Sequence, residues 1–397
     1  MIRTELTVRD GRIEQLAFTQ HDPYPRRGLT WTQDITVAVG YADRVQRLPV
    51  RLTGLRTELV AARGLPAPSF VLPNGGGIAY GGFRLDPVSL TWLATHLPEI
   101  SDGLTRGSAW VTLWDALLEG DLPASRFIDL TIAALPRETD EQNVQRVLSS
   151  LKRTFWTFTS APERAERSAS VERVLRDRLA VATSASLKSG YFSTLRDIAT
   201  TPDTTAWLTR IWRGEETVPG LTLAETDLIV LAEELAVREV PGWKAIVDGQ
   251  IARTTNPDRQ ARLQFVAPAL SSDQRERDRF FVALSDVANR RREAWVLDAL
   301  HYLHHPLRAP QSLKYIQPSL ALLQEIQQTG DIFFPTRWMD TTLGGHRSPE
   351  AAHTVRAFLD RAPATYPDRL RRTILSAADD LFRASGHARG SSPGAVR

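Results

Sequence analysis

The chain has 397 residues, and its 49 lysines and arginines stand against 46 aspartates and glutamates, so the formal net charge is only +3. Hydrophobic residues make up 42% and charged residues 24%, a globular balance that excludes a disordered or fibrous chain. Cysteine is absent, which excludes a disulfide framework, a thiol nucleophile and cysteine-ligated metals. Charges of both signs alternate along the chain, as on solvated helix faces, and this argues against a nucleic-acid partner.

The sequence contains no membrane or secretion signal that we can identify. No apolar run approaches the ~18 residues that a membrane helix needs, and the first residues do not combine a basic start with an apolar stretch. We therefore expect a cytoplasmic protein that has no membrane partner.

Residues 1–86 have the pattern of short strands. Asp10 and Gly11 separate two alternating runs, and both residues tolerate the positive φ of a tight hairpin. Pro49 lacks a donor for a ladder, so its run predicts an edge strand. The further strand-like runs are residues 30–32, 35–39, 48–52, 70–72 and 80–85. Short strands between frequent turn signals predict a small β-sandwich over residues 1–86.

From Asp86 onward the hydrophobic period changes from 2 to 3.6, which indicates helices. Asp86 followed by Pro87 is a typical helix start, with a carboxylate cap and proline in the first turn. Capping boxes are predicted from Ser160 to Glu163 and from Thr222 to Glu225. Two further starts join a capping hydroxyl to proline, at Thr201–Pro202 and at Ser348–Pro349. These signals predict serial helices joined by short loops.

The predicted fold is mainly α with a small N-terminal β domain. We expect a β-sandwich over residues 1–86, followed over residues 87–385 by an α-solenoid of HEAT/armadillo-like antiparallel helix pairs. No fixed repeat period is visible, so the array would be a degenerate one. Residues 386–397 are rich in Gly, Ser and Arg without periodicity and are predicted to form a disordered tail.

Three clustered histidines, His301, His304 and His305, are weak candidates for metal ligands. His301 and His305 are four residues apart and can share one helix face, but Tyr302 stands where a zinc protease motif has its glutamate. Downstream, His346 and His353 are the available further ligands. The alternative is a helix end, where imidazoles bind the last free carbonyls. We favour this alternative and predict no metal site.

Other polar features have structural explanations at least as good as functional ones. The glycines at 75–77 and 81–82 lack the following helix of a phosphate loop and are predicted to form a hairpin turn. The acidic pair Glu233–Glu234 is predicted to lie on a solvated helix face. The basic run Arg290–Arg292 can contact a carboxylate, a phosphate or the acidic face of a partner, but we favour a solvated helix start or an internal ion pair.

One stretch resembles a known family. Residues 72–74 and 79–86 resemble the junction between the β-sandwich and helical domains in M1-family zinc aminopeptidases, the aminopeptidase N and ERAP-like enzymes. Arg106, Trp110 and Asp115 then resemble a helix of that family's C-terminal domain. Further similar segments, in the same order, are residues 136–140, 291–297, 305–308 and 330–335. The resemblance covers roughly residues 2–385.

The resemblance implies a non-catalytic role. The family's His-Glu-x-x-His and Gly-x-Met-Glu-Asn motifs do not occur here, so no catalytic or metal residue is carried over, and zinc is expected only in the missing catalytic domain. The chain is expected to be inactive alone, to pair with an M1 catalytic domain in cis or in trans, and to cap its cleft and shape the access of peptides. Such a chain is a separately encoded half, a truncated frame or an excised piece.

For the contact with peptides we single out residues 304–315. Arg308 is the candidate for a peptide carboxylate, which its planar fork matches bidentately, and Tyr315 is a second candidate. An inter-helix ion pair is the alternative for Arg308. Three other functions stay open: a free-standing α-solenoid scaffold that binds proteins, a nucleic-acid-binding helical repeat and a metalloenzyme built on the three histidines. The hypothesis of a chain that pairs with a catalytic domain predicts an exposed apolar patch on the sandwich, where that domain would sit.

Overall fold

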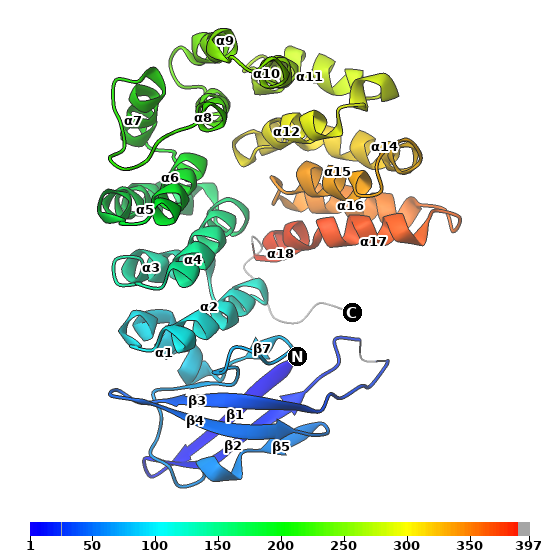
Figure 1. Ribbon diagram of the computed structural model, residues 1–397. Helices are drawn as coiled ribbons and strands as arrows, with labels where there is room; N and C mark the ends of the chain where they lie inside the picture. The colour runs from blue at the N-terminus through cyan, green and yellow to red at the C-terminus, as the bar shows by residue number, and fades with distance from the viewer. Residues whose placement is uncertain (25, 388–397) are drawn as a thin grey trace. The chain divides into compact units, whose positions relative to one another are not determined.

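The computed structural model describes residues 1–24 and 26–387, without the side chain of His387 (Figure 1). The chain forms two compact units, Met1–Thr154 and Phe155–Arg397. The first contains every strand of the described residues together with four α-helices, and the second is helical. A small β region followed by a solenoid-like helical region confirms the predicted fold class, and the two units are described separately below.

The first sheet of the β-sandwich has the strand order β5-β2-β1-β7. Its central hairpin joins β1 (Ile2–Arg9) to β2 (Arg12–Gln20) in antiparallel pairing. Asp10 and Gly11 at the turn have φ values of 49° and 72°, which confirms the hairpin predicted at this dipeptide. β5 (Arg56–Glu58) pairs with β2, and the two-residue β7 (Phe83–Arg84) pairs in parallel with β1.

The second sheet has the order β4-β3-β6 and lies against the first (Figure 1). It consists of β3 (Gln33–Gly40), β4 (Val45–Leu52) and β6 (Phe70–Leu72). Pro49 lies in β4, which is an edge strand as predicted. Alternate apolar side chains from both sheets form the core between them, among them Ile13, Leu16, Phe18, Val37, Val39 and Val71.

Two predicted strand segments are wrong for the same physical reason. The N–H and C=O of Trp31 bond the side-chain amide of Gln20, so residues 30–32 form no strand. The side-chain amide of Gln33 holds the N–H and C=O of Tyr80 in the same way, and the strand predicted over 80–85 shrinks to β7. In both cases a glutamine amide takes the place of a neighbouring strand.

The glycines at 75–77 form a turn, but the predicted hairpin is wrong. The turn leads from β6 to β7, and these two strands belong to different sheets. Gly75 has a packing reason: a Cβ there would lie 2.5 Å from Cβ and 2.7 Å from the backbone nitrogen of Ala38. The glycine therefore lets the turn pass close against β3.

Four α-helices complete the first unit: α1 (Pro87–His96), α2 (Gly103–Leu118), α3 (Ala124–Ala134) and α4 (Glu141–Arg153). Asp86 accepts hydrogen bonds from the backbone nitrogens of Val88 and Ser89, which confirms the predicted cap of α1. Arg106 on α2 binds Glu138 through two hydrogen bonds, 2.9 and 2.6 Å long, and thereby joins α2 to the α3–α4 connection.

The boundary between the two units falls in the π-helical turn η3 (Thr154–Phe158), and the second unit begins at Phe155. Its α-helices are α5 (Ala161–Val181), α6 (Ala185–Ile198), α7 (Pro202–Arg213), α8 (Glu225–Val237), α9 (Trp243–Arg253), α10 (Pro257–Leu270), α11 (Gln274–Ala283), α12 (Glu293–Leu303), α13 (Ala309–Ser312), α14 (Ile316–Thr329), α15 (Phe334–Leu343), α16 (Pro349–Arg361), α17 (Asp368–Ala377) and α18 (Asp379–His387). Each helix packs on helices close to it in the chain, for example α5 on α6, α8 on α9, α10 on α12 and α15 on α17. The finer HEAT/armadillo assignment stays a prediction.

The ends of the second unit's helices follow the sequence in most places. Ser160 and Glu163 form the predicted capping box of α5, and Thr201 and Ser348 cap α7 and α16. Of the predicted disordered tail over 386–397, Gly386 and His387 lie in α18, and the remainder lies outside the described residues.

The capping box predicted from Thr222 to Glu225 is wrong. α8 begins at Glu225, and the carboxylate of Asp227 accepts from the backbone nitrogen of Ala224. Glu225 instead accepts from the backbone nitrogen and hydroxyl of Thr255, both at 2.8 Å. The capping carboxylate is thus that of Asp227, two residues after the predicted Glu225.

Within residues 1–24 and 26–387, no helix is at once long enough and apolar enough to cross a bilayer.

Candidate functional site

The acidic pair on α8 is buried, which corrects the prediction of a solvated face. Glu233 accepts a 2.5 Å hydrogen bond from Arg262 on α10 and a 3.1 Å bond from the hydroxyl of Tyr302 on α12. Glu234 pairs with Arg238 one turn further along α8. Burial raises the pKa of Glu233 to about 7, against the opposing effect of Arg262. Pairs of arginine and carboxylate therefore lie between the helices of this region.

The run Arg290–Arg292 includes an internal structural arginine. Arg290 is buried and donates to the carbonyl oxygens of Leu284 and Ser285 and, at 2.6 Å, to Glu325 on α14. Arg106 uses the same arrangement in the first unit, where it binds the carbonyls five and six residues before it and a carboxylate. Of the alternatives left open for this run, the internal ion pair describes Arg290.

The three histidines at the end of α12 have different surroundings. His301 is exposed. His305 is buried, and its Nδ1 accepts from the backbone nitrogen of Leu307, so it caps the following turn. The ring of His305 also meets the edge of Trp156 at 5.1 Å between centroids. Burial lowers the pKa of His305 well below its usual value, with neighbouring arginines acting in the same direction.

His304 forms a buried pair with His346. Nδ1 of His304 lies 2.9 Å from Nε2 of His346, and burial lowers the pKa of both rings, that of His346 to about 4. Nε2 of His304 is buried without a partner among the described residues. We infer that Nδ1 of His304 donates the hydrogen bond, because Nε2 is then an unfilled acceptor rather than a more costly unfilled donor.

A glycine permits the approach of this histidine pair. A Cβ at Gly345 would lie 1.6 Å from the carbonyl oxygen of His304, so only glycine fits this position of the α15–α16 connection. Nδ1 of His304 and Nδ1 of His305 are both engaged in hydrogen bonds within the protein. In the described part of the chain, no three histidine, aspartate or glutamate side chains come together as metal ligands. These residues do not fit a zinc site.

Arg308 is buried and lies in the 3₁₀ turn η5 (Pro306–Arg308). Its two terminal nitrogens donate to the carbonyls of Ala269 and Leu270 at the end of α10, at 2.8 and 2.7 Å, and Glu239 lies 3.7 Å away. Burial lowers its pKa to about 10. A contact between Arg308 and a peptide carboxylate stays a prediction, and it would require these bonds to be exchanged.

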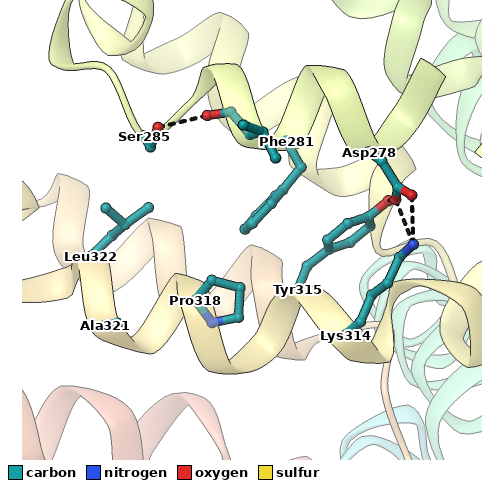
Figure 2. A pocket seen from close by; sticks show the side chains of 9 residues that line it. Asp278, Phe281, Ser285, Lys314, Tyr315, Pro318, Ala321 and Leu322 are labelled. Atoms are coloured by element: carbon teal, nitrogen blue, oxygen red, sulfur yellow. Dashed lines mark hydrogen bonds and ion pairs between the residues drawn. The ribbon is translucent and has the colours of Figure 1, made fainter. Parts of the chain in front are cut away.

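Tyr315 lines a surface pocket between α11 and the start of α14 (Figure 2). The pocket has a volume of about 550 Å³, and its apolar wall includes Phe281, Pro318 and Leu322. Tyr315 stacks on Phe281 with 4.5 Å between ring centroids. The structure thus places one of the two predicted peptide-binding residues at a pocket and the other beneath the surface.

Asp278 fixes the polar end of this pocket. It accepts from the ammonium of Lys314 at 2.6 Å and from the hydroxyl of Tyr315 at 2.5 Å, as Figure 2 shows. These bonds, that of Lys314 first, lower the pKa of Asp278 to about 2. Burial and Asp278 raise the pKa of Tyr315. The pocket can therefore hold an apolar side chain beside a fixed pair of opposite charges.

A group of exposed apolar side chains lies at one end of the β-sandwich. We call Trp31, Leu55, Ile78 and Tyr80 the sandwich-end patch; Ile78 and Tyr80 are 87% and 86% exposed. Gln20, the last residue of β2, binds the carbonyls of Trp31 and Gly54, and Gln33, the first of β3, binds Tyr80. The two glutamines hold these loops at the same end of the two sheets. The hypothesis of a docked domain predicts an exposed apolar patch on the sandwich without saying where, and this group is the candidate for it.

Sequence reasoning missed Arg164 and Arg347. Arg164 lies in the first turn of α5, above the ring of Trp156 at 5.3 Å, and Arg347 lies in the α15–α16 connection. The capping box at Ser160 is a local signal that places Arg164 at a helix start. Arg347 lies 183 residues after Arg164 in the sequence, so no local pattern relates the two residues.

Comparisons with known proteins place the chain in a family. A relative, the aminopeptidase N of Streptomyces lividans, is 23% identical over 241 residues, which cover 57% of this chain and 28% of the relative. The chain thus matches less than a third of that protein's length. Residues 70–382 match the family described as the ERAP1-like C-terminal domain, which is most of the chain. The chain therefore belongs to the family of ERAP1-like C-terminal domains.

Proposed function

We propose that this chain is the non-catalytic C-terminal region of an M1-type metalloaminopeptidase. The match of residues 70–382 to the ERAP1-like C-terminal domain carries the proposal, and the similarity to an aminopeptidase N supports it. The chain acts with a zinc-bearing catalytic domain, in cis or in trans, and we place this complex in the cytoplasm. It caps the catalytic cleft and shapes the access of peptide substrates.

The catalytic chemistry belongs to the partner domain in this proposal. The printed sequence has neither His-Glu-x-x-His nor Gly-x-Met-Glu-Asn, and His304 and His305 are held by contacts within the protein. Zinc in the catalytic domain supplies the Lewis acid for peptide hydrolysis. The residues described here contribute packing, shape and charge, and the chain is inactive alone.

The sandwich-end patch is the surface that we assign to the catalytic domain. Isolated exposed apolar residues are ordinary, but several held together at one end of a domain mark an interaction surface. Trp31 and Tyr80 each combine an apolar ring with a polar atom, and such residues are frequent in protein interfaces. The rigid attachment of both loops through Gln20 and Gln33 keeps the patch in shape before docking.

For peptide contact we propose Tyr315, with Arg308 as the second candidate. The pocket beside Tyr315 has room for an apolar side chain of a long peptide. The fixed charges of Asp278 and Lys314 at its end orient polar atoms of the peptide chain.

The first experiment measures hydrolysis of an aminoacyl-naphthylamide by the purified chain with zinc supplied. We expect no turnover. The chain is then mixed with the part of the Streptomyces lividans aminopeptidase N that the alignment leaves unmatched. We expect a complex that trims long peptides differently from the catalytic part alone. Chelator-sensitive hydrolysis that co-purifies with the chain would overturn the proposal.

Variants of the sandwich-end patch test the docking surface. We expect Tyr80→Asp to weaken the complex at least about tenfold, because a desolvated interface aromatic contributes over ~1.4 kcal/mol. Val60→Asp is the matched control: Val60 is 67% exposed on the same unit, in the turn η1 (Val60–Ala62). Equal affinities of the two variants would contradict the assignment.

A free-standing α-solenoid that binds other proteins is the second candidate function. The pocket between α11 and α14 favours it, because this apolar surface lies on the helical unit rather than on the sandwich. Leu322→Asp separates the two functions. If the chain is a scaffold, the substitution should abolish the binding of its partner protein at the pocket. If the chain docks on a catalytic domain through the sandwich-end patch, the affinity of that complex should not change.

A further inference from the structure

A second pocket adjoins the pocket beside Tyr315 along α14. It has a volume of about 320 Å³ and lies between α14 and the end of α16 with the connection that follows. Its walls include Gln317 and Gln324 from α14 and Phe358 from α16. Ala321, labelled in Figure 2, is exposed and lines both pockets, so only a small side chain separates them. α14 therefore has a pocket on each flank, one toward α11 and one toward α16.

The second pocket has an unpartnered polar group in its wall. Tyr366 lines the pocket, is only 6% exposed, and meets the edge of Phe358 at 5.7 Å between ring centroids. Its hydroxyl is buried and has no hydrogen-bond partner among the described residues. Burial raises the pKa of Tyr366, so the hydroxyl stays protonated and can donate. A ligand oxygen in this pocket would supply the partner that the buried hydroxyl lacks.

The two pockets differ in charge. At the first pocket, Asp278 and Lys314 neutralise each other through their 2.6 Å ion pair. Arg361 is the charged residue in the lining of the second pocket. It is exposed, and its Nε donates to the carbonyl oxygen of Ala357 one turn earlier, at 2.9 Å. No carboxylate of the described residues lies within salt-bridge distance of Arg361. The first pocket thus suits an apolar side chain, and the second suits a carboxylate on an aliphatic stem.

Gln317 and Gln324 are suited to hold a peptide main chain between the pockets. Both are exposed on α14, and neither side chain has a hydrogen-bond partner within residues 1–24 and 26–387. A side-chain amide offers both a donor and an acceptor, which match the N–H and C=O of an extended residue. The first unit contains this arrangement, since Gln20 binds both groups of Trp31. The same contact is available to a peptide that lies along α14.

The spacing of the two glutamines fits an extended chain. They are seven positions apart in the sequence, which corresponds to a rise of about 10 Å along the helix. An extended chain covers that distance in about three residues. Successive side chains of such a chain point to opposite sides. A chain that runs along α14 over Ala321 thus directs one side chain toward the first pocket and the next toward the second.

We infer that α14 and its two flanking pockets bind an extended segment of a peptide substrate in which an apolar residue stands next to a glutamate. Main-chain amides of the segment bind Gln317 and Gln324. The apolar side chain enters the pocket beside Tyr315, and the glutamate carboxylate binds Arg361 and the hydroxyl of Tyr366. The inference rests on the peptide contact proposed for Tyr315, and it adds which side chains the peptide carries at this site.

The test measures binding of a short fluorescein-labelled peptide to the whole chain by fluorescence anisotropy. The probe has the sequence Glu-Leu-Glu between alanines and serines, so that a glutamate adjoins the leucine in either direction of the chain. Its ends are acetylated and amidated, so neither end carries a charge. A matched probe with Gln-Leu-Gln is expected to bind about tenfold more weakly, because it loses a charge-assisted hydrogen bond. A probe with Glu-Ser-Glu is expected to lose a similar factor, because the first pocket then stays unfilled.

Variants of the second pocket identify the contact with the carboxylate. Arg361→Ala should weaken binding of the acidic probe about tenfold and leave the affinity for the Gln-Leu-Gln probe unchanged. Tyr366→Phe should weaken binding of the acidic probe about threefold. The Tm of this variant should not fall, because the hydroxyl makes no bond in the free protein. A fall in Tm with unchanged affinity would assign the hydroxyl to the folded structure and contradict the site.

Ala321→Trp tests the groove without removing a polar contact. The larger side chain fills the space at the junction of the two pockets and should abolish binding of the acidic probe. Ala252→Trp is the control, at an exposed alanine of α9 that lines neither pocket. Equal affinities of these two variants, or of the acidic and amide probes for the wild type, would overturn the inference. The complex with a catalytic domain is measured without peptide, so failure of the groove and failure of the proposed docking are distinguishable.

Discussion

Half-buried arginines of the helical unit fall into two contrasting groups. Where α8, α10 and α12 meet, Arg262 contacts both Glu233 and Asp298, at 2.5 and 2.7 Å. Arg164 at the start of α5 and Arg347 in the α15–α16 connection are half-buried, and neither has a carboxylate within salt-bridge distance among the described residues. The comparison teaches that burial of a charge does not by itself mark a ligand site. What distinguishes the two groups is whether a half-buried charge has a partner.

The largest expected effect is on the paired region. Arg262→Ala should lower the free energy of unfolding of this unit by about 3–5 kcal/mol, because the buried carboxylate of Glu233 loses its counter-charge. Urea unfolding measures the loss. Arg259→Ala is the control: its ion pair with Glu225 is more exposed and should contribute less than ~1 kcal/mol. Equal losses of free energy in the two variants would show that the ion pair at Glu233 contributes no more to stability than the exposed one at Glu225.

The second effect concerns pH and the pair of His304 and His346. Their folded pKa values are lowered, so the unfolded chain takes up protons first as the pH falls below about 6.5. The stability they contribute is complete above that pH and is lost toward pH 4, by roughly 3 kcal/mol for a ring shifted as far as His346. Unfolding at a series of pH values should therefore show a smaller acid loss in His346→Gln than in the wild type.

Glu233 acts in the opposite sense and must be separated from this effect. Its folded pKa of about 7 is raised, so its contribution is present at low pH and lost as the pH rises through 7. The difference between wild type and His346→Gln cancels this contribution, which both proteins share. A difference that does not vary between pH 6.5 and 4 would contradict the histidine assignment.

A smaller effect is expected at the pocket. Tyr315→Phe removes the hydroxyl that donates to Asp278 at 2.5 Å and should lower stability by about 1–2 kcal/mol. The pKa of Asp278 should rise at the same time, although Lys314 still holds it below its usual value. Titration of the Asp278 carboxyl by NMR measures this rise. An unchanged pKa would mean that Lys314 alone sets it.

The smallest effect is expected for Arg347. Arg347→Ala should change the free energy of unfolding by less than ~1 kcal/mol, because the side chain makes no hydrogen bond or ion pair with the described residues that the substitution could remove. The contrast with Arg262→Ala is the sharpest form of the comparison, since both residues are arginines of the same unit and differ in whether they have a partner. A loss of several kcal/mol in both variants would contradict the expected difference between paired and unpaired arginines.

The sequence predicted what local chemistry determines. Asp10-Gly11, Asp86 and the capping box at Ser160 each act through neighbours in the chain, and the structure confirms all three. The errors arise where a distant group competes. Gln20 and Gln33 replace strand partners, and Arg262 draws a carboxylate of α8 into the interior.

The candidate site was predictable only in part for the same reason. Tyr315 was found through a family resemblance, and the structure places it at a pocket. The unpaired state of Arg164 and Arg347 is invisible in a sequence in which arginines and carboxylates alternate. Whether an arginine finds a partner depends on which helices meet, and a local pattern holds no information about that.

The edge strand β4 has a consequence for self-association. An open sheet edge invites a second copy to continue the ladder. Thr36 of β3 lies opposite Pro49, the residue that interrupts the row of donors along the outer side of β4. Arg47 and Arg51 flank it at exposed positions, where Arg47 pairs with Asp102 and Arg51 adds a charge beside the edge. The outer edge of β4 is therefore closed to growth by strand addition, and a second copy cannot extend this sheet there.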